Sequence, residues 1–140
     1  MLIQTRVPSH HAVRCAVAHD YQGFVREELD GRVKPPYPPT IRLANVVFSA
    51  TTEAAAAKLA ISAAAWLQRL VRQAKGTVQI VGPAPCPVDR IKSRWRWHLL
   101  LKTGHSGELT KVARYFLERF PVSKEASLRV TFDRDPVALL

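Results

Sequence analysis

A cluster of prolines constrains this chain more than any other feature, because it forces a division into two parts. Four of the five residues over 35–39 are proline, with Tyr37 between them. Proline fixes its own φ, lacks an N–H and disfavours the helical conformation of the preceding residue, so neither a helix nor a central strand can run through this segment. The sequence therefore predicts a stiff linker over 35–39, with separate units over 1–34 and 40–140.

The segment before the linker is too small to bury a core of its own. Residues 1–6 are typical of a short strand. Ser9 is a candidate N-cap for a helix over about 10–19, and Asp20 is one for a helix over 21–31. One strand and two helices leave an apolar face uncovered, so residues 1–34 are predicted to be the end of a larger domain.

Three potential metal ligands lie on one face of the first predicted helix. His11, Cys15 and His19 follow one another at steps of four residues. Zinc, however, spreads its ligands tetrahedrally, and three side chains from a single helix cannot easily converge on one ion. We therefore predict that these residues pack against other parts of the protein, and that the chain holds no metal.

The segment after the linker alternates strand and helix patterns. Branched residues over 41–48 indicate a strand. The predicted order is strand, helix, strand, strand, helix, strand, over residues 41–48, 52–75, 78–81, 94–102, 107–120 and 128–132, with Thr51 and Ser106 as candidate N-caps. The core-facing helical stripes are Ala56, Leu59, Ala63, Leu67, Leu70 and Ala74, then Leu109, Val112, Ala113, Phe116, Leu117 and Phe120. This order predicts an α+β fold of the ferredoxin-like, split β-α-β type (β-α-β-β-α-β), with both helices on one face of a four-stranded antiparallel sheet and the other face open or half open.

The strand over 94–102 has two chemically different faces. A proline turn at Gly82-Pro83-Ala84-Pro85 and a basic loop are predicted to precede it. Side chains alternate along a strand, so one face is expected to be cationic and the other apolar. The cationic face would hold Arg94, Arg96 and His98, and the apolar face Trp95, Trp97, Leu99 and Leu101. The cationic face suits phosphates and the apolar face suits a core. An ordinary half-buried strand with a solvated charged face explains the same pattern, and both interpretations stay open here.

Charge narrows the class of partner. The net charge is +10, and residues 35–140 carry most of it, with sixteen Lys and Arg against seven Asp and Glu. A strongly basic domain usually has a polyanionic partner, of which nucleic acid is the commonest. A ribosomal or a membrane-surface role fits the charge equally well. No apolar run reaches a membrane span, and two unrelated cysteines, Cys15 and Cys86, suit a reducing cytoplasm.

Catalytic motifs are missing from the sequence. Lys92-Ser93 and Lys102-Thr103 have no glycine loop before them, so there is no phosphate-binding loop for ATP. Cys86 has no histidine nearby to act as its base. Asp133 and Asp135 could bind a divalent ion, but a turn that ends the last strand, with salt bridges to arginines, is favoured. We predict that this chain alone is not an enzyme and carries no cofactor.

An ordered set of short motifs resembles the C-terminal end of the PriA family, the primosomal replication-restart helicases also called primosomal protein N-prime. The motifs match in order and spacing along almost the whole chain. They are Phe24 with Glu27-Glu28-Leu29 and Arg32, then Tyr37-Pro38-Pro39, Gly82-Pro83-Ala84-Pro85, Arg94-Trp95-Arg96-Trp97 and Asp133-Arg134-Asp135-Pro136.

The resemblance implies a role for each part. Residues 1–34 would be the remnant of the second RecA-like helicase lobe, and 40–140 a C-terminal DNA-binding domain similar to a ribosomal small-subunit protein. The family's full-length members are ATP-dependent 3′-to-5′ helicases that reload the replication machinery at stalled forks. Their ATP, Mg and Zn sites lie outside the part that this chain matches. Forked or single-stranded DNA, single-stranded DNA-binding protein and primosome proteins are the implied partners, in the cytoplasm near the nucleoid.

The implied site residues lie mainly in the basic loop and strand. Phosphate contacts are expected from Arg90, Lys92, Arg94, Arg96 and Lys102. Trp95 or Trp97 would stack a base, although tryptophan at such positions more often belongs to the core. The family's pocket for single-stranded DNA-binding protein uses a basic residue and a glutamine at the start of the second domain helix. Ser106 and Thr110 stand there in this chain, so the contact is expected at Lys111 and Arg114 instead. An RNA-binding structural protein and a purely structural brace remain the alternatives.

Overall fold

The computed structural model describes residues 2–33, 37–122 and 127–136. The chain forms two compact units, Met1–Thr40 and Ile41–Leu140. The division lies at the end of the predicted proline linker, of which residues 35 and 36 fall outside the described part.

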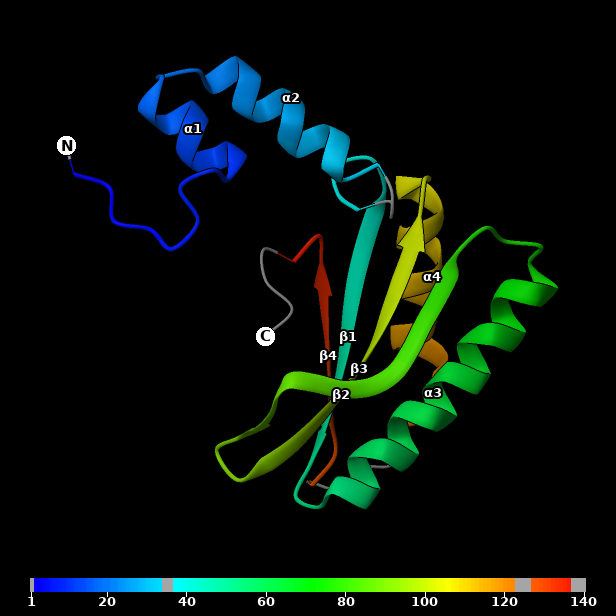
Figure 1. The fold of residues 1–140 in the computed structure, drawn as a ribbon. Helices are drawn as coiled ribbons and strands as arrows, with labels where there is room; N and C mark the ends of the chain where they lie inside the picture. Colours follow the sequence, from blue (N-terminus) through cyan, green and yellow to red (C-terminus); the bar gives the residue numbers. More distant parts are fainter. Residues whose placement is uncertain (1, 34–36, 123–126, 137–140) are drawn as a thin grey trace. The chain divides into compact units, whose positions relative to one another are not determined.

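The first unit is a pair of short helices, α1 His11–Val17 and α2 Tyr21–Gly31 (Figure 1). Asp20 caps α2 as predicted, and its Oδ1 accepts a hydrogen bond of 2.8 Å from the Gly23 N–H. Ser9 does not cap α1, because the cap is His10, whose Nδ1 accepts from Ala12. The strand predicted over 1–6 is wrong in its described part: residues 2–6 form none, since the described residues of this unit offer no strand to pair with it.

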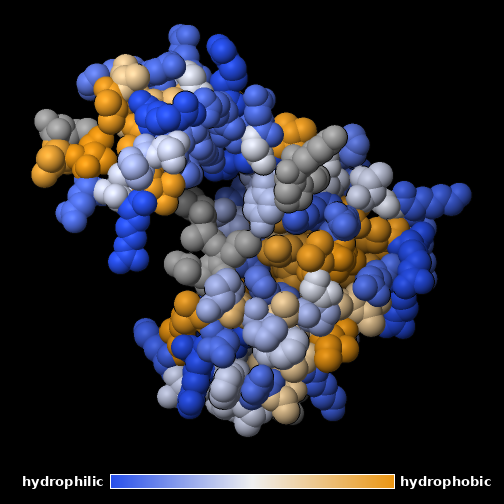
Figure 2. Space-filling view, viewed as in Figure 1, coloured by the Kyte–Doolittle hydropathy of each residue, from blue (hydrophilic) through white to orange (hydrophobic). Residues whose placement is uncertain are grey.

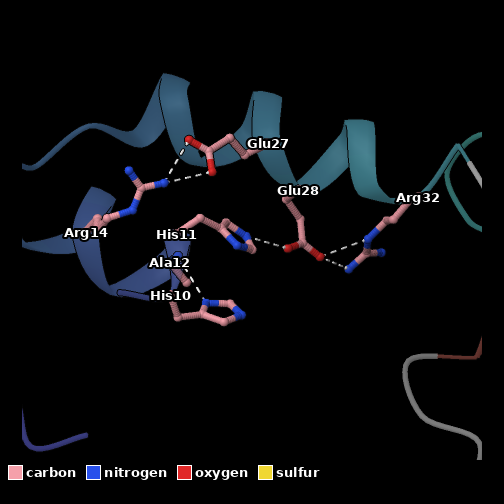
Figure 3. A network of polar contacts seen from close by, with 7 residues as sticks. All are labelled: His10, His11, Ala12, Arg14, Glu27, Glu28 and Arg32. Carbon is pink, nitrogen blue, oxygen red and sulfur yellow. Dashed lines mark hydrogen bonds and ion pairs between the residues drawn. The ribbon is translucent and has the colours of Figure 1, made fainter. Parts of the chain in front are cut away.

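Polar contacts join α1 to α2, as Figure 3 shows. His11 Nε2 lies 3.1 Å from one carboxylate oxygen of Glu28, whose other oxygen pairs with Arg32 at 2.7 Å. Arg14 pairs with Glu27 at 3.2 Å. The hydrogen bonds from Arg32 and then His11 hold the pKa of Glu28 below its usual value. Among the described residues of this unit only Cys15 is buried, so these polar contacts join two helices that share almost no buried side chains.

The second unit is an α+β fold, and this part of the prediction is confirmed. Its elements are β1 Arg42–Ala50, α3 Glu53–Gln73, β2 Gln79–Ile91, β3 Arg94–Thr103, α4 Ser106–Arg119 and β4 Arg129–Arg134. The strands form one antiparallel sheet in the order β2-β3-β1-β4. This order is compatible with the split β-α-β arrangement, since β3 lies between the two strands that α3 connects.

The core lies between both helices and one face of this sheet. Alternate residues of the strands meet the helix stripes, and the largest fully buried side chains of this core are Phe48, Phe116, Leu67, Leu99, Leu101, Leu109 and Val46. The predicted stripes are correct except at Ala74 and Leu117, which are exposed. Ala74 follows the last residue of α3. Leu117 is turned about 100° from Phe116 around the helix axis, away from the sheet.

The helix ends differ slightly from the prediction. Thr52, rather than Thr51, caps α3 by accepting from the Ala55 N–H. His105, rather than Ser106, is the N-cap residue of α4, and it makes no side-chain cap bond. Helix α3 stops at Gln73, and Lys75 adopts the left-handed conformation that ends it, with φ of 50°.

The proline turn predicted at Gly82-Pro83-Ala84-Pro85, and the basic loop predicted after it, are instead part of a strand. β2 runs from Gln79 to Ile91, with register shifts against β3 between Val81 and Ala84 and between Pro85 and Arg90. Prolines are tolerated there because β2 is an edge strand, which has a neighbouring strand on one side only. On its other side no strand needs a backbone N–H donor from β2. Gly82 lies at the first shift with φ of 100°, and a Cβ there would lie 3.0 Å from the His98 carbonyl oxygen.

Glu108 bonds the start of α4 to Thr77, which lies just before β2, and to Thr103 at the end of β3. Its carboxylate accepts from the Thr77 N–H at 2.5 Å, from the Thr77 hydroxyl at 2.6 Å and from the Thr103 hydroxyl at 3.4 Å. The Thr77 bonds are the main cause of a lowered pKa for Glu108. A carboxyl group whose pKa is lowered by folding stabilises the protein at a pH above its ordinary pKa of 4.5. This stabilisation is lost as the pH falls through the lower pKa of the folded state.

We therefore expect acid to destabilise the parent more than the Glu108→Gln variant. Melting temperatures measured from pH 7 down to about pH 3 should converge as the pH falls, because protonation of Glu108 removes in the parent what the substitution has already removed. Glu118→Gln is the matched control on the same helix, because it removes a carboxylate that forms no hydrogen bond or ion pair among the described residues. A constant gap between parent and Glu108→Gln would contradict this.

Candidate nucleic-acid interface

The sheet face opposite the helices carries a shallow depression of about 410 Å³. Cross-strand pairing brings its residues together, since Ser49 of β1 lies between Arg96 of β3 and Arg129 of β4. The residues that line it are Asn45, Val47, Ser49, Ile91, Lys92, Arg94, Arg96, Arg129, Thr131 and Asp133. The face is therefore formed by all four strands, with Ile91 from β2, and by the turn between β2 and β3.

Four cations and one carboxylate line this depression. The cations are Lys92, Arg94, Arg96 and Arg129, and the carboxylate is Asp133. Lys92 and Ser93 form the two-residue turn between β2 and β3, and both have positive φ, as in the turns that suit the twist of a hairpin. Figure 2 shows hydrophilic side chains gathered over this hairpin. The predicted cationic face thus exists, and it is broader than a single strand.

Arg94 is anchored in the protein itself. Its Nη2 donates to the Ser49 carbonyl at 3.0 Å and to the Ser127 carbonyl at 2.5 Å, and its Nε lies 3.4 Å from the Ser49 hydroxyl. Arg96 also bonds to the protein, because its Nη1 donates to the Val88 carbonyl at 3.3 Å. Both guanidinium groups are held in place, which limits the entropy lost when they contact a ligand.

Lys92 and Arg129 differ from these two arginines. Neither forms an ion pair or a side-chain hydrogen bond within the part of the chain that the structure describes. Arg129 was missed by the sequence reasoning, although the pattern contained the signal. Val130 and Phe132 face the core, so alternation assigns Arg129 and Thr131 to the open face.

A buried amide lies at the middle of the open face. Asn45 is buried in the central strand, and its Oδ1 lies 3.2 Å from Nδ1 of His98. Burial, and secondarily the charge of Arg96, lowers the pKa of His98. Near neutral pH this ring is therefore uncharged, and the positive charge of the face comes from its arginines and lysine.

The two tryptophans of β3 lie on the other side of the sheet. Trp97 packs against the core cluster, and Trp95 shares its face by alternation. Arg90 pairs with Trp95 across the hairpin, with its guanidinium carbon 5.2 Å from the ring centroid. Such a cation–π contact accounts for both side chains without a ligand. Arg90, Trp95 and Trp97 are therefore separated from the open face that holds Arg94 and Arg96.

The remaining predicted residues lie elsewhere in the second unit. Lys102 is near the far end of β3, opposite Leu43 and Gln79. Lys111 and Arg114 line a hollow on the surface of α4. Asp135, just after β4, accepts from the Leu43 N–H and pairs with Arg42 and Arg134 at 3.8 Å, so the predicted salt bridges at the end of the last strand are confirmed for this residue. Asp133 instead lies within β4 and lines the depression.

The described residues offer little for catalysis or metal binding. Burial raises the pKa of the Cys86 thiol, which disfavours the reactive thiolate. His11 is bonded to Glu28, whereas Cys15 and His19 line a mainly apolar pocket of about 440 Å³ with Phe24. Within residues 2–33, 37–122 and 127–136, no three His, Cys, Asp or Glu side chains are grouped to hold a metal ion.

Comparison with known proteins decides the family. A model of the primosomal protein N C-terminal domain, PriA_C, matches residues 35–137. The chain belongs to the PriA family. It is 35% identical over 140 residues to the replication restart protein PriA of Treponema pallidum, covering 100% of this chain and 20% of that protein. It is 28% identical to PriA of Bacillus subtilis, covering 100% of this chain and 17% of that protein. It is 32% identical to PriA of a Synechocystis strain, covering 99% of this chain and 16% of that protein.

The match confirms the resemblance to the C-terminal region of PriA. The family model begins in the proline segment and covers the second unit as far as residue 137, whereas the PriA relatives also align with residues 1–34. The chain spans a fifth or less of the length of these PriA relatives. None of the helices that the structure describes is both long and apolar enough to cross a membrane.

Proposed function

We propose that this chain serves replication restart as a DNA-binding part of a PriA helicase, and that the open sheet face of its second unit contacts DNA phosphates. One observation carries the proposal: among the described residues, four cations and one carboxylate line the sheet face opposite α3 and α4. Cationic side chains that displace condensed counterions from DNA supply most of the affinity in binding of this kind.

The geometry favours phosphates over base edges. The cations are spread over β3, β4 and the hairpin turn, so they suit a backbone that crosses the strands rather than one base pair. A guanidinium group can match phosphate oxygens with two parallel N–H donors. Arg129 suits this contact, because its side chain forms no hydrogen bond among the described residues, whereas Arg94 has only its Nη1 donors left for a phosphate. Such contacts hold forked and single-stranded DNA with little preference for sequence.

The proposal also assigns a role to the first unit, as the end of a helicase lobe, and to α4, as a contact for a protein partner. With only Cys15 buried among its described residues, the α1–α2 pair lacks a core of its own, which supports its assignment to the end of a helicase lobe. ATP hydrolysis would then belong to other parts of the protein. Lys111 and Arg114 on α4 are proposed to contact single-stranded DNA-binding protein.

The test is the salt dependence of DNA binding by the full chain. The double variant Lys92→Ala, Arg129→Ala removes the two cations that lack partners among the described residues. For duplex DNA, each lost phosphate contact should lower the slope of log K against log salt by roughly 0.9. The slope should therefore fall by about 1.8, and equally for unrelated sequences. Fluorescence anisotropy with labelled forked, duplex and single-stranded DNA measures it.

The matched control is Lys58→Ala, Lys75→Ala, which removes the same charge from the region of α3 on the opposite side of the sheet. Its slope should change little. Equal slopes for the open-face variant and its parent would contradict the proposal. Structured RNA that outcompetes forked DNA would favour the RNA-binding alternative, and failure of the parent to bind any nucleic acid at low salt would favour the structural brace.

A further inference from the structure

A partly exposed aromatic pair lies where α3 meets α4, on the helical side of the second unit. The rings of Trp66 and Tyr115 are stacked, with centroids 5.9 Å apart and planes inclined by 23°. Phe116 and Phe120 also contact the Trp66 ring in edge-to-face geometry, each with a centroid distance of 5.8 Å. Tyr115 is 47% exposed. The pair is therefore a fixed aromatic surface that solvent reaches.

This pair forms one wall of a hollow of about 300 Å³. The other lining residues are Arg69, Leu70 and Gln73, which follow Trp66 on one face of α3 at steps of three to four residues. No Asp or Glu lines the hollow among the described residues, and Arg69 has no ion-pair partner there. The hollow thus combines ring faces, a cation and an amide without an opposing negative charge.

Sites for single-stranded nucleic acid combine these groups. Every base has a π-face that stacks on an aromatic side chain, and a neighbouring arginine contacts the phosphate. The amide of Gln73 can donate to and accept from a base edge. A duplex keeps its base faces stacked inside, so this combination selects an unpaired strand.

We propose that the hollow formed by Trp66, Arg69, Gln73 and Tyr115 is a second nucleic-acid site, in which a base of a single strand stacks on the aromatic pair and Arg69 holds the adjoining phosphate. The proposal rests on the DNA-binding function proposed above and adds to it. The hollow and the cationic depression lie on opposite sides of the sheet, so one unit can hold two segments of a branched substrate.

Tyr115→Ala tests the stacking. Removing the ring should weaken binding of a labelled oligodeoxythymidylate of about 12 nucleotides by about tenfold, as expected for one lost stack. Blunt duplex DNA and an abasic strand of the same length should bind as they do to the parent. Tyr115→Phe keeps the ring and should restore binding. Since the ring of Tyr115 is half-exposed, the melting temperature of the alanine variant should stay close to that of the parent.

Several outcomes overturn this inference. If Tyr115→Ala binds the oligonucleotide as tightly as the parent while the Lys92, Arg129 double variant binds it more weakly, the second site is absent and the proposed function stands. An equal loss for the abasic strand shows that the ring does not stack a base. An acidic peptide that displaces no oligonucleotide but loses affinity in Tyr115→Ala assigns the hollow to a protein partner. If the parent binds no nucleic acid at low salt, both proposals fail.

Discussion

Replacing Trp97 with alanine should lower the free energy of unfolding by about 3 kcal/mol, the low end of the range for removing a large aromatic side chain from a core. Trp97 is only partly buried, but it packs against the cluster that contains Phe48 and Leu99. Phe48 is its neighbour across the strands and is fully buried. The cavity would therefore open beside the middle of the sheet. Chemical denaturation of the full chain measures the change.

Trp95→Ala is the matched control for this substitution. Trp95 lies on the same side of β3, but it is not among the residues that pack against the core, and Arg90 covers its ring. Its replacement should cost much less than that of Trp97. If Trp97→Ala left the unfolding curve unchanged and abolished binding of single-stranded DNA, Trp97 would be a base-stacking residue and its assignment to the core would be wrong.

Strands and helices with regular hydrophobic spacing could be predicted from the sequence. The stripes from Ala56 to Leu67 and from Leu109 to Phe116 face the core as expected, because a helix that covers a sheet must bury such a stripe. The segment from Gly82 to Ile91 could not be predicted. Its prolines indicate a turn locally, but an edge strand accepts them, and only the assembled sheet shows that β2 lies at an edge.

The candidate site was predicted in part for a similar reason. Alternation along one strand identified Arg94 and Arg96, and the same rule applied to β4 would have identified Arg129. The pairing of Trp66 with Tyr115 joins two helices that are far apart in sequence, and no local pattern reveals which residues of two helices meet. The carbonyl contacts of Arg94 depend on the position of Ser127, which follows from the packing of β4 against β1.

Arg94→Ala should destabilise the second unit as well as weaken DNA binding. The guanidinium joins β3 to the Ser49 carbonyl of β1 and to the Ser127 carbonyl just before β4. Hydrogen bonds to a charged group contribute about 1.5–3 kcal/mol each, and these two are partly buried. Solvent replaces part of that contribution, so we expect a total loss of about 2 kcal/mol in the free energy of unfolding. Denaturant unfolding measures it.

Arg129→Ala is the control that separates the two effects of Arg94. Both side chains line the cationic depression, but Arg129 has no hydrogen-bond partner among the described residues. Its replacement should weaken DNA binding without lowering stability. Arg94→Lys should fall between parent and alanine, because an ammonium group keeps the charge and loses the planar pair of donors. If Arg94→Ala unfolded like the parent and lost only DNA affinity, its two carbonyl contacts would carry no stability and Arg94 would serve the phosphates alone.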